Sequence, residues 1–256
     1  MSQDPVIEAR SLNLTFTTND GPVHALSDVN LTIRKGDFVS FIGPSGCGKT
    51  TFLRTLAALE YPTSGTVRVN GLTPDEARQK RAYGYVFQHA GLYPWRTIAG
   101  NIKLPLEIMG FSKSEQLRRT DEVLRLVELE DFSKKYPWQL SGGMQQRASI
   151  ARALAFDAEL LLMDEPFGAL DALTRAHLQD SLMEIHADLG NTVIMITHDV
   201  DEAVLLSDRI VMMTNGPAAS IGEVLSVDLP RPRDRVVLAE DPDFNNYRQQ
   251  VLRFLY

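Results

Sequence analysis

The sequence predicts an α/β fold built on a mainly parallel β-sheet, with a block of helices inserted into it. Between residues 160 and 213, short apolar runs alternate with a helical pattern, which is typical of strand–helix–strand units in a buried parallel sheet. The stretch at about 93–156 has a different, helical pattern. With 256 residues, of which 44% are hydrophobic and 23% charged, the chain is long and apolar enough to form such a core.

The N-terminal part of the chain carries several strand signals and one helix. Short runs rich in apolar residues and bounded by turn residues predict strands. These strands are Val6–Ala9, Leu12–Phe16, Val29–Ile33, Phe38–Ile42 and Thr66–Val69. Thr50–Leu59, directly after a glycine-rich loop, is predicted to be a helix, and the aromatic run at 83–87 a further strand.

Two long helices are expected within the inserted block. Ser112 and Glu115 have the spacing of a capping box, and they precede a helix that runs through Val127. Gly142–Ala155 follows as another helix, with its apolar residues on one stripe. We therefore place a helical insertion at about 93–156.

The C-terminal half returns to strands. Leu160–Met163, Val193–Ile196 and Ile210–Met213 are expected to be strands, and a helix from Thr174 ends at the C-cap pair Gly190–Asn191. We expect one domain over residues 1–225 and a tail over 226–256. The tail begins near PRPR (230–233) and is predicted to end in a helix at Asp243–Leu255 that buries Phe244, Tyr247, Val251 and Leu255.

Charge and composition exclude some functions. The net charge of −7 argues against a nucleic-acid partner, which a basic face would attract. No apolar run is long enough to cross a bilayer, and MSQDPVIEAR at the N-terminus lacks the features of a secretory signal. The single cysteine, Cys47, fits a reducing compartment. We expect a cytoplasmic protein whose membrane association depends on partners.

The loop GPSGCGKT at 43–50 matches the P-loop pattern G-x4-G-K-[ST] between an apolar strand and a helix. Its backbone amides can face phosphate oxygens, the Lys49 ammonium can reach the β- and γ-phosphates, and the Thr50 hydroxyl can bind Mg²⁺. Cys47 is expected to be a small side chain that fits the loop; alternatively, the helix N-terminus activates it as a thiol. The residues expected to bind nucleotide here are Gly43, Pro44, Ser45, Gly46, Cys47, Gly48, Lys49, Thr50 and Thr51.

Two carboxylates follow the apolar run LLLM at 160–163. A buried strand that ends beside a P-loop delivers its acids to the nucleotide site. We expect Asp164 in the Mg²⁺ sphere and Glu165 as the base for the attacking water. His198 ends the next strand, parallel to the first, from where its imidazole can reach a γ-phosphate. Gln88 follows the aromatic strand and offers an amide that binds Mg²⁺ weakly.

A second phosphate site is predicted at LSGGMQQR (140–147). Ser141 is placed to cap a helix, with the amides of Gly142 and Gly143 beside it and the positive helix end behind. An insertion outside the sheet holds Ser141 away from the chain's own P-loop. We therefore expect it to bind the γ-phosphate held by a second copy of the chain, in a two-fold dimer joined by two ATP molecules.

In this order, the P-loop, Gln88, LSGGM (140–144), LLLMDEP (160–166), ALD (169–171) and His198 resemble the ATP-binding cassette ATPases, over about residues 6–222. The resemblance implies a P-loop NTPase core with an N-terminal antiparallel β subdomain and an inserted helical subdomain. It also implies ATP and Mg²⁺ as cofactors, and a signature motif, Gln145 included, that binds the partner's nucleotide.

The resemblance also assigns roles to single residues. It makes Asp171 a residue that crosses the dimer interface, Gln88 the sensor of γ-phosphate and Mg²⁺, and His198 the switch histidine. Phe16 would stack on adenine, where the family more often has tyrosine; alternatively, it is a core residue of its strand. Met144 stands where LSGGQ is commonest, but it leaves the Ser141 hydroxyl and the glycine backbone unchanged, so the motif is expected to function.

Finer features resemble the nitrate, sulfonate and taurine importer branch of this family. They are GLYPWRTIAGNI (91–102), YPWQLSGGMQQR (136–147), DEPFGALDALTR (164–175) and LPRPRDR (229–235). This resemblance implies a membrane permease as partner, an extracytoplasmic solute-binding protein and a location at the inner face of the cell membrane. Tyr93–Arg96 would dock the permease; alternatively, Trp95 packs inside the helical insertion.

Two other functions are compatible with a P-loop. A cassette ATPase acting in DNA repair or translation would keep the chemistry without a transporter, but the long coiled-coil insertion or second cassette of such proteins is missing from this acidic chain. A small-molecule kinase would leave LSGGM, the Asp164–Glu165 pair and His198 without a role.

Overall fold

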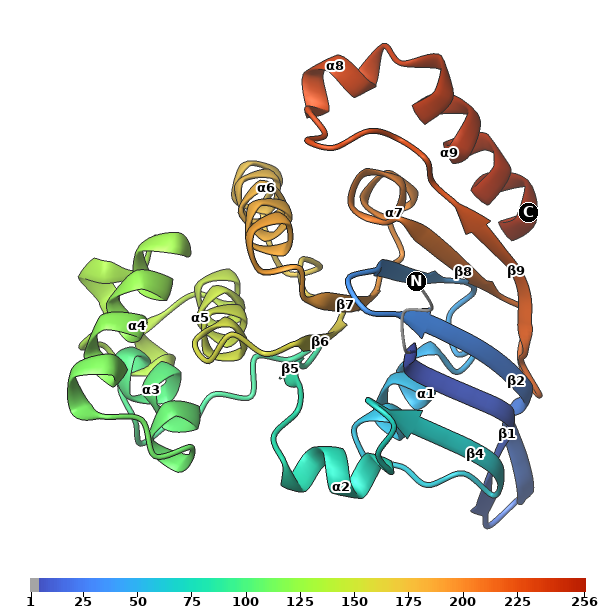
Figure 1. Ribbon diagram of the computed structural model, residues 1–256, viewed down its shortest axis with the longest axis horizontal. Helices are drawn as coiled ribbons and strands as arrows, with labels where there is room; N and C mark the ends of the chain where they lie inside the picture. Colours follow the sequence, from blue (N-terminus) through green and yellow to red (C-terminus); the bar gives the residue numbers. More distant parts are fainter. Residues whose placement is uncertain (1–4) are drawn as a thin grey trace.

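The computed structural model describes residues 5–256 and places the strands in two sheets. The strands are β1 (Pro5–Thr18), β2 (Gly21–Arg34), β3 (Phe38–Ile42), β4 (Ser64–Val69), β5 (Gly84–Val86), β6 (Leu160–Asp164), β7 (Thr192–Ile196), β8 (Arg209–Met213) and β9 (Ile221–Ser226). The α-helices are α1 (Lys49–Leu56), α2 (Pro74–Gln79), α3 (Ile98–Ile108), α4 (Lys113–Leu126), α5 (Gly142–Leu154), α6 (Ala172–Leu189), α7 (Val200–Leu206), α8 (Arg235–Ala239) and α9 (Pro242–Leu255). Figure 1 shows their arrangement.

The larger sheet has the order β5-β6-β7-β3-β8-β9 and is parallel except for the edge strand β9. Every residue of β3, β6 and β7 is buried. Helices cover both faces of a parallel sheet, so its central strands are buried along their whole length and mostly apolar. The predicted α/β fold with a mainly parallel sheet is confirmed.

The smaller sheet is antiparallel, with the order β2-β1-β4. The prediction of two strands at 6–9 and 12–16 was wrong, because β1 is one strand that is interrupted by register shifts between Ala9 and Leu14. Ser11 takes a φ of 43° there, which adds a bulge to the strand. β2 also begins at Gly21, eight residues before the predicted Val29, because residues 22–24 are exposed and the stretch before Val29 has no continuous apolar run.

Helix α1 packs between the two sheets and ends before the predicted Leu59. Ala58 has a φ of 50°, and the amide of Leu59 bonds back to the carbonyl of Arg54, five residues earlier. This left-handed turn closes the helix at Leu56.

Helices α3, α4 and α5 lie side by side in the left part of Figure 1, with α5 against the edge strand β5 and α3 and α4 farther from the sheet. Ser112 caps α4, and the Glu115 carboxylate accepts a hydrogen bond from the Ser112 backbone amide, as the capping-box spacing predicted. Two 3₁₀ segments, Glu130–Phe132 and Pro137–Gln139, connect α4 to α5. None of the helices within residues 5–256 has the length and apolar character to span a membrane.

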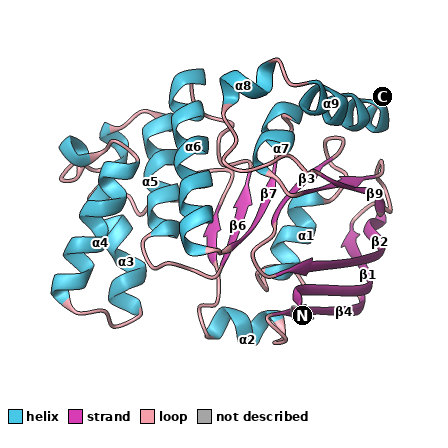
Figure 2. Cartoon of the chain, turned by 45° about the horizontal axis from the view of Figure 1, so that its top comes forward, coloured by secondary structure: helices cyan, strands magenta, loops and turns pink. Residues whose placement is uncertain are grey.

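The tail folds back over the core, with α9 along α7 and α8 above α6 (Figures 1 and 2). The predicted terminal helix exists. Phe244 and Val251 are buried in it, and Tyr247 and Leu255 are half-buried.

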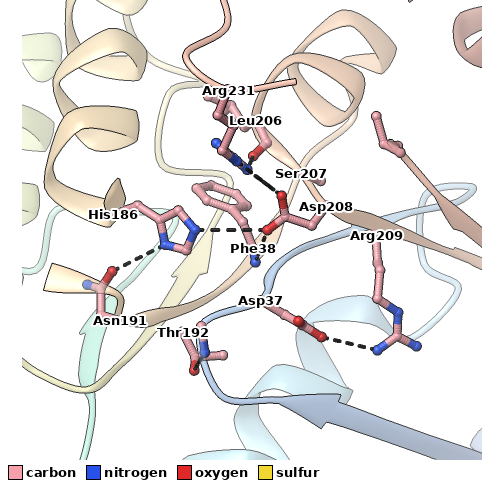
Figure 3. Close-up of polar contacts among 12 residues, drawn as sticks. Asp37, Phe38, His186, Asn191, Thr192, Leu206, Ser207, Asp208, Arg209 and Arg231 are labelled. Carbon is pink, nitrogen blue, oxygen red and sulfur yellow. Dashed lines mark hydrogen bonds and ion pairs between the residues drawn. The ribbon is translucent and has the colours of Figure 1, made fainter. Parts of the chain in front are cut away.

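A partly buried polar cluster at the amino end of β3 joins the sheet, α6 and the tail (Figure 3). The Asp208 carboxylate accepts the Phe38 amide at 2.8 Å and the Arg231 guanidinium at 2.8 Å. The imidazole of His186, 6% exposed, lies 3.9 Å from Asp208 and 3.4 Å from Asn191. Burial lowers the pKa of His186, with Arg231 adding to the effect and Asp208 opposing it.

Candidate active site

The P-loop runs from the end of β3 to the start of α1. Gly48 is the N-cap of α1 with a φ of 92°, in the left-handed region. A Cβ at this position would lie 2.8 Å from the Leu26 side chain and 3.0 Å from the Ala25 carbonyl. Both the backbone angle and the close approach of β2 therefore require glycine.

Lys49 is buried, with 5% of the residue exposed, and its ammonium bends back over the loop. It donates to the carbonyls of Gly43 at 2.7 Å and Pro44 at 2.9 Å. These contacts hold a positive charge at the centre of the loop, where phosphate oxygens can replace the carbonyl acceptors.

Thr50 and Asp164 bring two oxygen donors together. The Thr50 hydroxyl donates to Asp164 Oδ1 at 3.0 Å, from the first turn of α1 to the end of β6. Burial raises the pKa of the Asp164 carboxyl, and the bond from Thr50 opposes this shift. A hydroxyl and a carboxylate are the ligands that Mg²⁺ prefers when substrate phosphates supply the rest of its sphere.

The Glu165 carboxylate lies between two other predicted residues. Its Oε1 is 2.5 Å from His198 Nε2, and its Oε2 accepts from Gln88 Nε2 at 3.1 Å. The backbone of Glu165 has a φ of 47°, held by a bond from its amide to the carbonyl of Ile196 on β7. A non-glycine residue in this conformation is strained, and such strain is typical of functional sites.

These groups open into one cavity of about 940 Å³. Of the residues predicted to bind nucleotide or act on it, those that line it are Phe16, Pro44, Ser45, Gly46, Cys47, Gly48, Lys49, Thr50, Thr51, Gln88, Glu165 and His198. Gly43 and Asp164 touch the lining residues Lys49 and Thr50 from behind. The structure thus gathers residues from five separate segments.

Sequence reasoning missed part of the cavity wall. Val23, His24 and Ala25 come from β2, where Val23 pairs with Phe16 across the hairpin. Asn215–Pro217 come from the turn after β8, and a Cβ on Gly216 would lie 3.3 Å from the Gly46 carbonyl. The only signal for this turn is its Asn-Gly-Pro sequence, which predicts a turn without saying what it packs against.

The signature motif is not part of this cavity. Ser141 is exposed and caps α5, with its Oγ accepting from the Met144 amide at 3.3 Å. A Cβ on Gly142 would meet no atom within 4 Å, so the helix start faces open space. Gln145 is also absent from the cavity lining, and its amide bonds to the Leu140 carbonyl.

Asp171 lies beside the signature motif. It caps α6 by accepting from the Thr174 amide at 3.0 Å, a bond that lowers the pKa of its carboxyl. A Cβ on Gly143 would lie 3.3 Å from the carbonyl of Ala169, two residues before Asp171. The motif and Asp171 therefore form one exposed surface, separate from the chain's own P-loop.

Trp95 is 70% exposed and Tyr93 41% exposed, with their rings 5.2 Å apart. The alternative that Trp95 packs inside the helical insertion was therefore wrong. Cys47 is 1% exposed and lies 3.7 Å from Lys49 Nζ, as a small side chain that fits the loop.

Residues 26–168 match the family described as ABC transporter. The chain belongs to this family. It is 48% identical to nitrate transport protein NasD of Klebsiella oxytoca, over 98% of this chain and 97% of that protein. Nitrate import ATP-binding protein NrtD of Synechococcus elongatus is 48% identical, over 94% of this chain and 88% of that protein. Bicarbonate transport ATP-binding protein CmpD of the same species is 44% identical over 99% and 91%.

A solved structure supports the same conclusion. A dimeric ATP-binding cassette in a post-hydrolysis state, bound to ADP and Pi, has 34% sequence identity and a TM-score of 0.79, and covers 88% of this chain and 100% of that one. This ABC transporter protein is therefore an ATP-binding, ATP-hydrolysing subunit with the cassette fold.

Proposed function

We propose that this ABC ATPase powers the import of nitrate or a chemically related small anion. The proposal is supported by two relatives named for nitrate and one named for bicarbonate, which are small planar oxyanions alike. The ATPase does not itself contact the solute, so the choice between these anions belongs to the permease and the solute-binding protein that we propose as partners.

The geometry supports a division of roles within the cavity. The P-loop amides and Lys49 hold the phosphates of ATP, and the Phe16 ring lies on the wall where adenine can stack. Thr50, Asp164 and Gln88 supply oxygen ligands for Mg²⁺, which when bound neutralises phosphate charge. Glu165 accepts the proton of the attacking water, and His198 orients the Glu165 carboxylate and the γ-phosphate.

We further propose that two copies complete the site. The observation that carries this is the position of Ser141, exposed at a helix start and outside the cavity that holds Lys49. A helix N-terminus with a serine cap and two glycine amides binds an anion. Only a second copy, related by a two-fold axis, can bring this helix start to the γ-phosphate, with Asp171 crossing beside it.

We assign residues 1–225 to the ATPase domain, with 93–156 as its inserted helical part, and 226–256 to a tail. Tyr93 and Trp95 then form an exposed aromatic surface at the start of the insertion, suited to docking a permease. Docking there places the protein at the inner face of the membrane.

Mixing two inactive variants tests the composite site. Lys49→Ala removes the P-loop lysine, and Ser141→Arg blocks the signature face. In an equimolar mixture half of the dimers are mixed, and each mixed dimer has one intact site, so ATPase activity should recover to about a quarter of the wild-type value if the sites act independently. If the mixture has no more ATPase activity than the separate variants, the proposed dimer is contradicted. Ser141→Arg should also leave ATP binding by the monomer unchanged.

A further inference from the structure

Residues of the tail contact both ends of α7, the helix that follows His198, and α9 lies alongside α7 in Figure 1. Arg233 has only 1% of its side chain exposed and donates to the carbonyls of Val204, Leu205 and Ser207, where α7 ends. At the other end, Arg248 pairs with Asp201 in the first turn. The nucleotide cavity contains no residue of the tail.

A chain of hydrogen bonds leads from the tail to the turn that carries His198, starting at the Arg235 side chain, which is 35% exposed, and buried from Gln179 onward. Arg235 donates to Gln179 Oε1 at 2.8 Å, and Gln179 Nε2 donates to Glu202 Oε1 at 2.7 Å. Glu202 Oε2 accepts from the hydroxyl of Thr197. Gln179, Glu202 and Thr197 are each less than 9% exposed.

The hydrogen bonds from Arg235 to Glu202 have a fixed donor-to-acceptor direction. A guanidinium only donates hydrogen bonds and a carboxylate only accepts them, so the Gln179 amide between them has one orientation that satisfies both. Without the guanidinium, the Gln179 oxygen loses this donor, and its side chain is then anchored in this chain of bonds only through its bond to Glu202. In a buried network such a loss affects every member.

The last link fixes the backbone on both sides of His198. The Thr197 hydroxyl donates to Glu202 and accepts the amide of Asp199 at 3.0 Å, which closes the turn 197–199. The His198 side chain is 44% exposed, and its ion-pair contact is with Glu165. With so little packing around the ring, the position of the imidazole depends on this turn.

We propose that Arg235 is a positioning residue for hydrolysis, acting through Gln179 and Glu202 to hold the turn that presents His198 to Glu165. This inference rests on the proposed role of His198. A small displacement of a catalytic group slows turnover far more than it weakens substrate binding.

The test measures ATP turnover by the full-length chain with substitutions along the series of hydrogen bonds Arg235–Gln179–Glu202–Thr197, called the relay below. Arg235→Met should lower kcat about tenfold while KM for ATP stays within about twofold, because the P-loop is untouched. Gln179→Leu should lower kcat at least as much. The double variant should be no slower than Gln179→Leu alone, since both changes break one chain.

Two control variants separate the relay from general effects. Asp180→Asn removes the ion pair of Arg235 with Asp180 at 3.0 Å but keeps the relay, and Arg253→Met removes an exposed arginine of α9. Both should leave kcat unchanged. Arg235→Lys keeps one donor for Gln179 and should restore kcat to within about threefold of the wild type.

Several outcomes would overturn the inference. They are an unchanged kcat in Arg235→Met, with or without a lower melting temperature, additive losses in the double variant, or an Arg235→Lys chain as slow as Arg235→Met. If Arg235→Met does not fold, Arg235→Lys and Gln179→Leu decide alone. His198→Ala distinguishes the two proposals. If His198→Ala turns over ATP at the wild-type rate, the proposed role of His198 is wrong. If His198→Ala is slow but Arg235→Met turns over ATP at the wild-type rate, the relay is wrong and the role of His198 stands.

Discussion

Replacing Glu165 by glutamine separates the chemical step from nucleotide binding. The carboxylate makes two contacts, with His198 at 2.5 Å and Gln88 at 3.1 Å. An amide has the same shape and keeps one oxygen, and the Gln88 amide can turn its own oxygen to the new donor. The substitution therefore removes the proton acceptor while the walls of the cavity stay in place.

The expected loss follows from the role of a general base, which contributes about 10²- to 10⁴-fold, or about 3–5 kcal/mol of transition-state free energy. Glu165→Gln should lower kcat by this factor and leave the affinity for ATP within about threefold. Because hydrolysis no longer separates the copies, a dimer should accumulate with ATP. Phosphate release measures kcat, and size-exclusion chromatography with ATP measures the dimer.

A matched control lies just before the same strand. Glu159 has a side chain that is 68% exposed, and its ion pair with Lys35 spans 3.8 Å, so Glu159→Gln should behave as the wild type. A Glu165→Gln chain that hydrolyses ATP at the wild-type rate would refute the assignment of Glu165 as the base.

Three other substitutions test separate features. Lys49→Ala should abolish ATP binding or turnover, because it removes the buried charge at the centre of the loop; a near-normal rate would exclude the P-loop from the mechanism. His186→Gln should flatten the pH dependence of stability: burial lowers the folded-state pKa below the ordinary 6.5, so the unfolded chain takes up a proton first and wild-type stability falls as the pH drops below about 6.5. Urea midpoints at about pH 7.5 and 5.5 measure this. If the midpoint falls between these pH values by the same amount in the wild type and in His186→Gln, the prediction is contradicted. Trp95→Ala should leave the turnover of the isolated chain unchanged but reduce its co-purification with the permease; undiminished recovery would place docking elsewhere.

Local chemistry made much of the site predictable. The P-loop, the Asp164–Glu165 pair and His198 are each tied to a strand end by adjacent residues, so their meeting at one edge of the sheet follows from parallel strands. The helix starts capped by Ser112 and Ser141 were also predictable, because a capping side chain bonds to an amide only three residues away.

Contacts between distant segments were not predictable in this way. No pattern near Gly216 indicates that its turn packs on Gly46, and the bulge at Ser11 appears only when β1 pairs with β2 on one side and β4 on the other. The relay from Arg235 to Thr197 joins four segments through side chains that are unremarkable in sequence.

Residues that are close together in the sequence were enough to predict the ATP-binding cassette, with its parallel core, its phosphate loop, its two acids and a signature helix start that has no phosphate of its own to bind. Each of these depends on residues within a few positions of one another or on the shared direction of the strands. The folded structure was needed to show which surfaces meet, namely that Gln88 and His198 both contact Glu165, that Asp171 lies beside the signature motif, and that the tail reaches the turn of His198. Such contacts depend on how whole elements pack, and packing is set by the summed fit of many side chains rather than by any single stretch of residues.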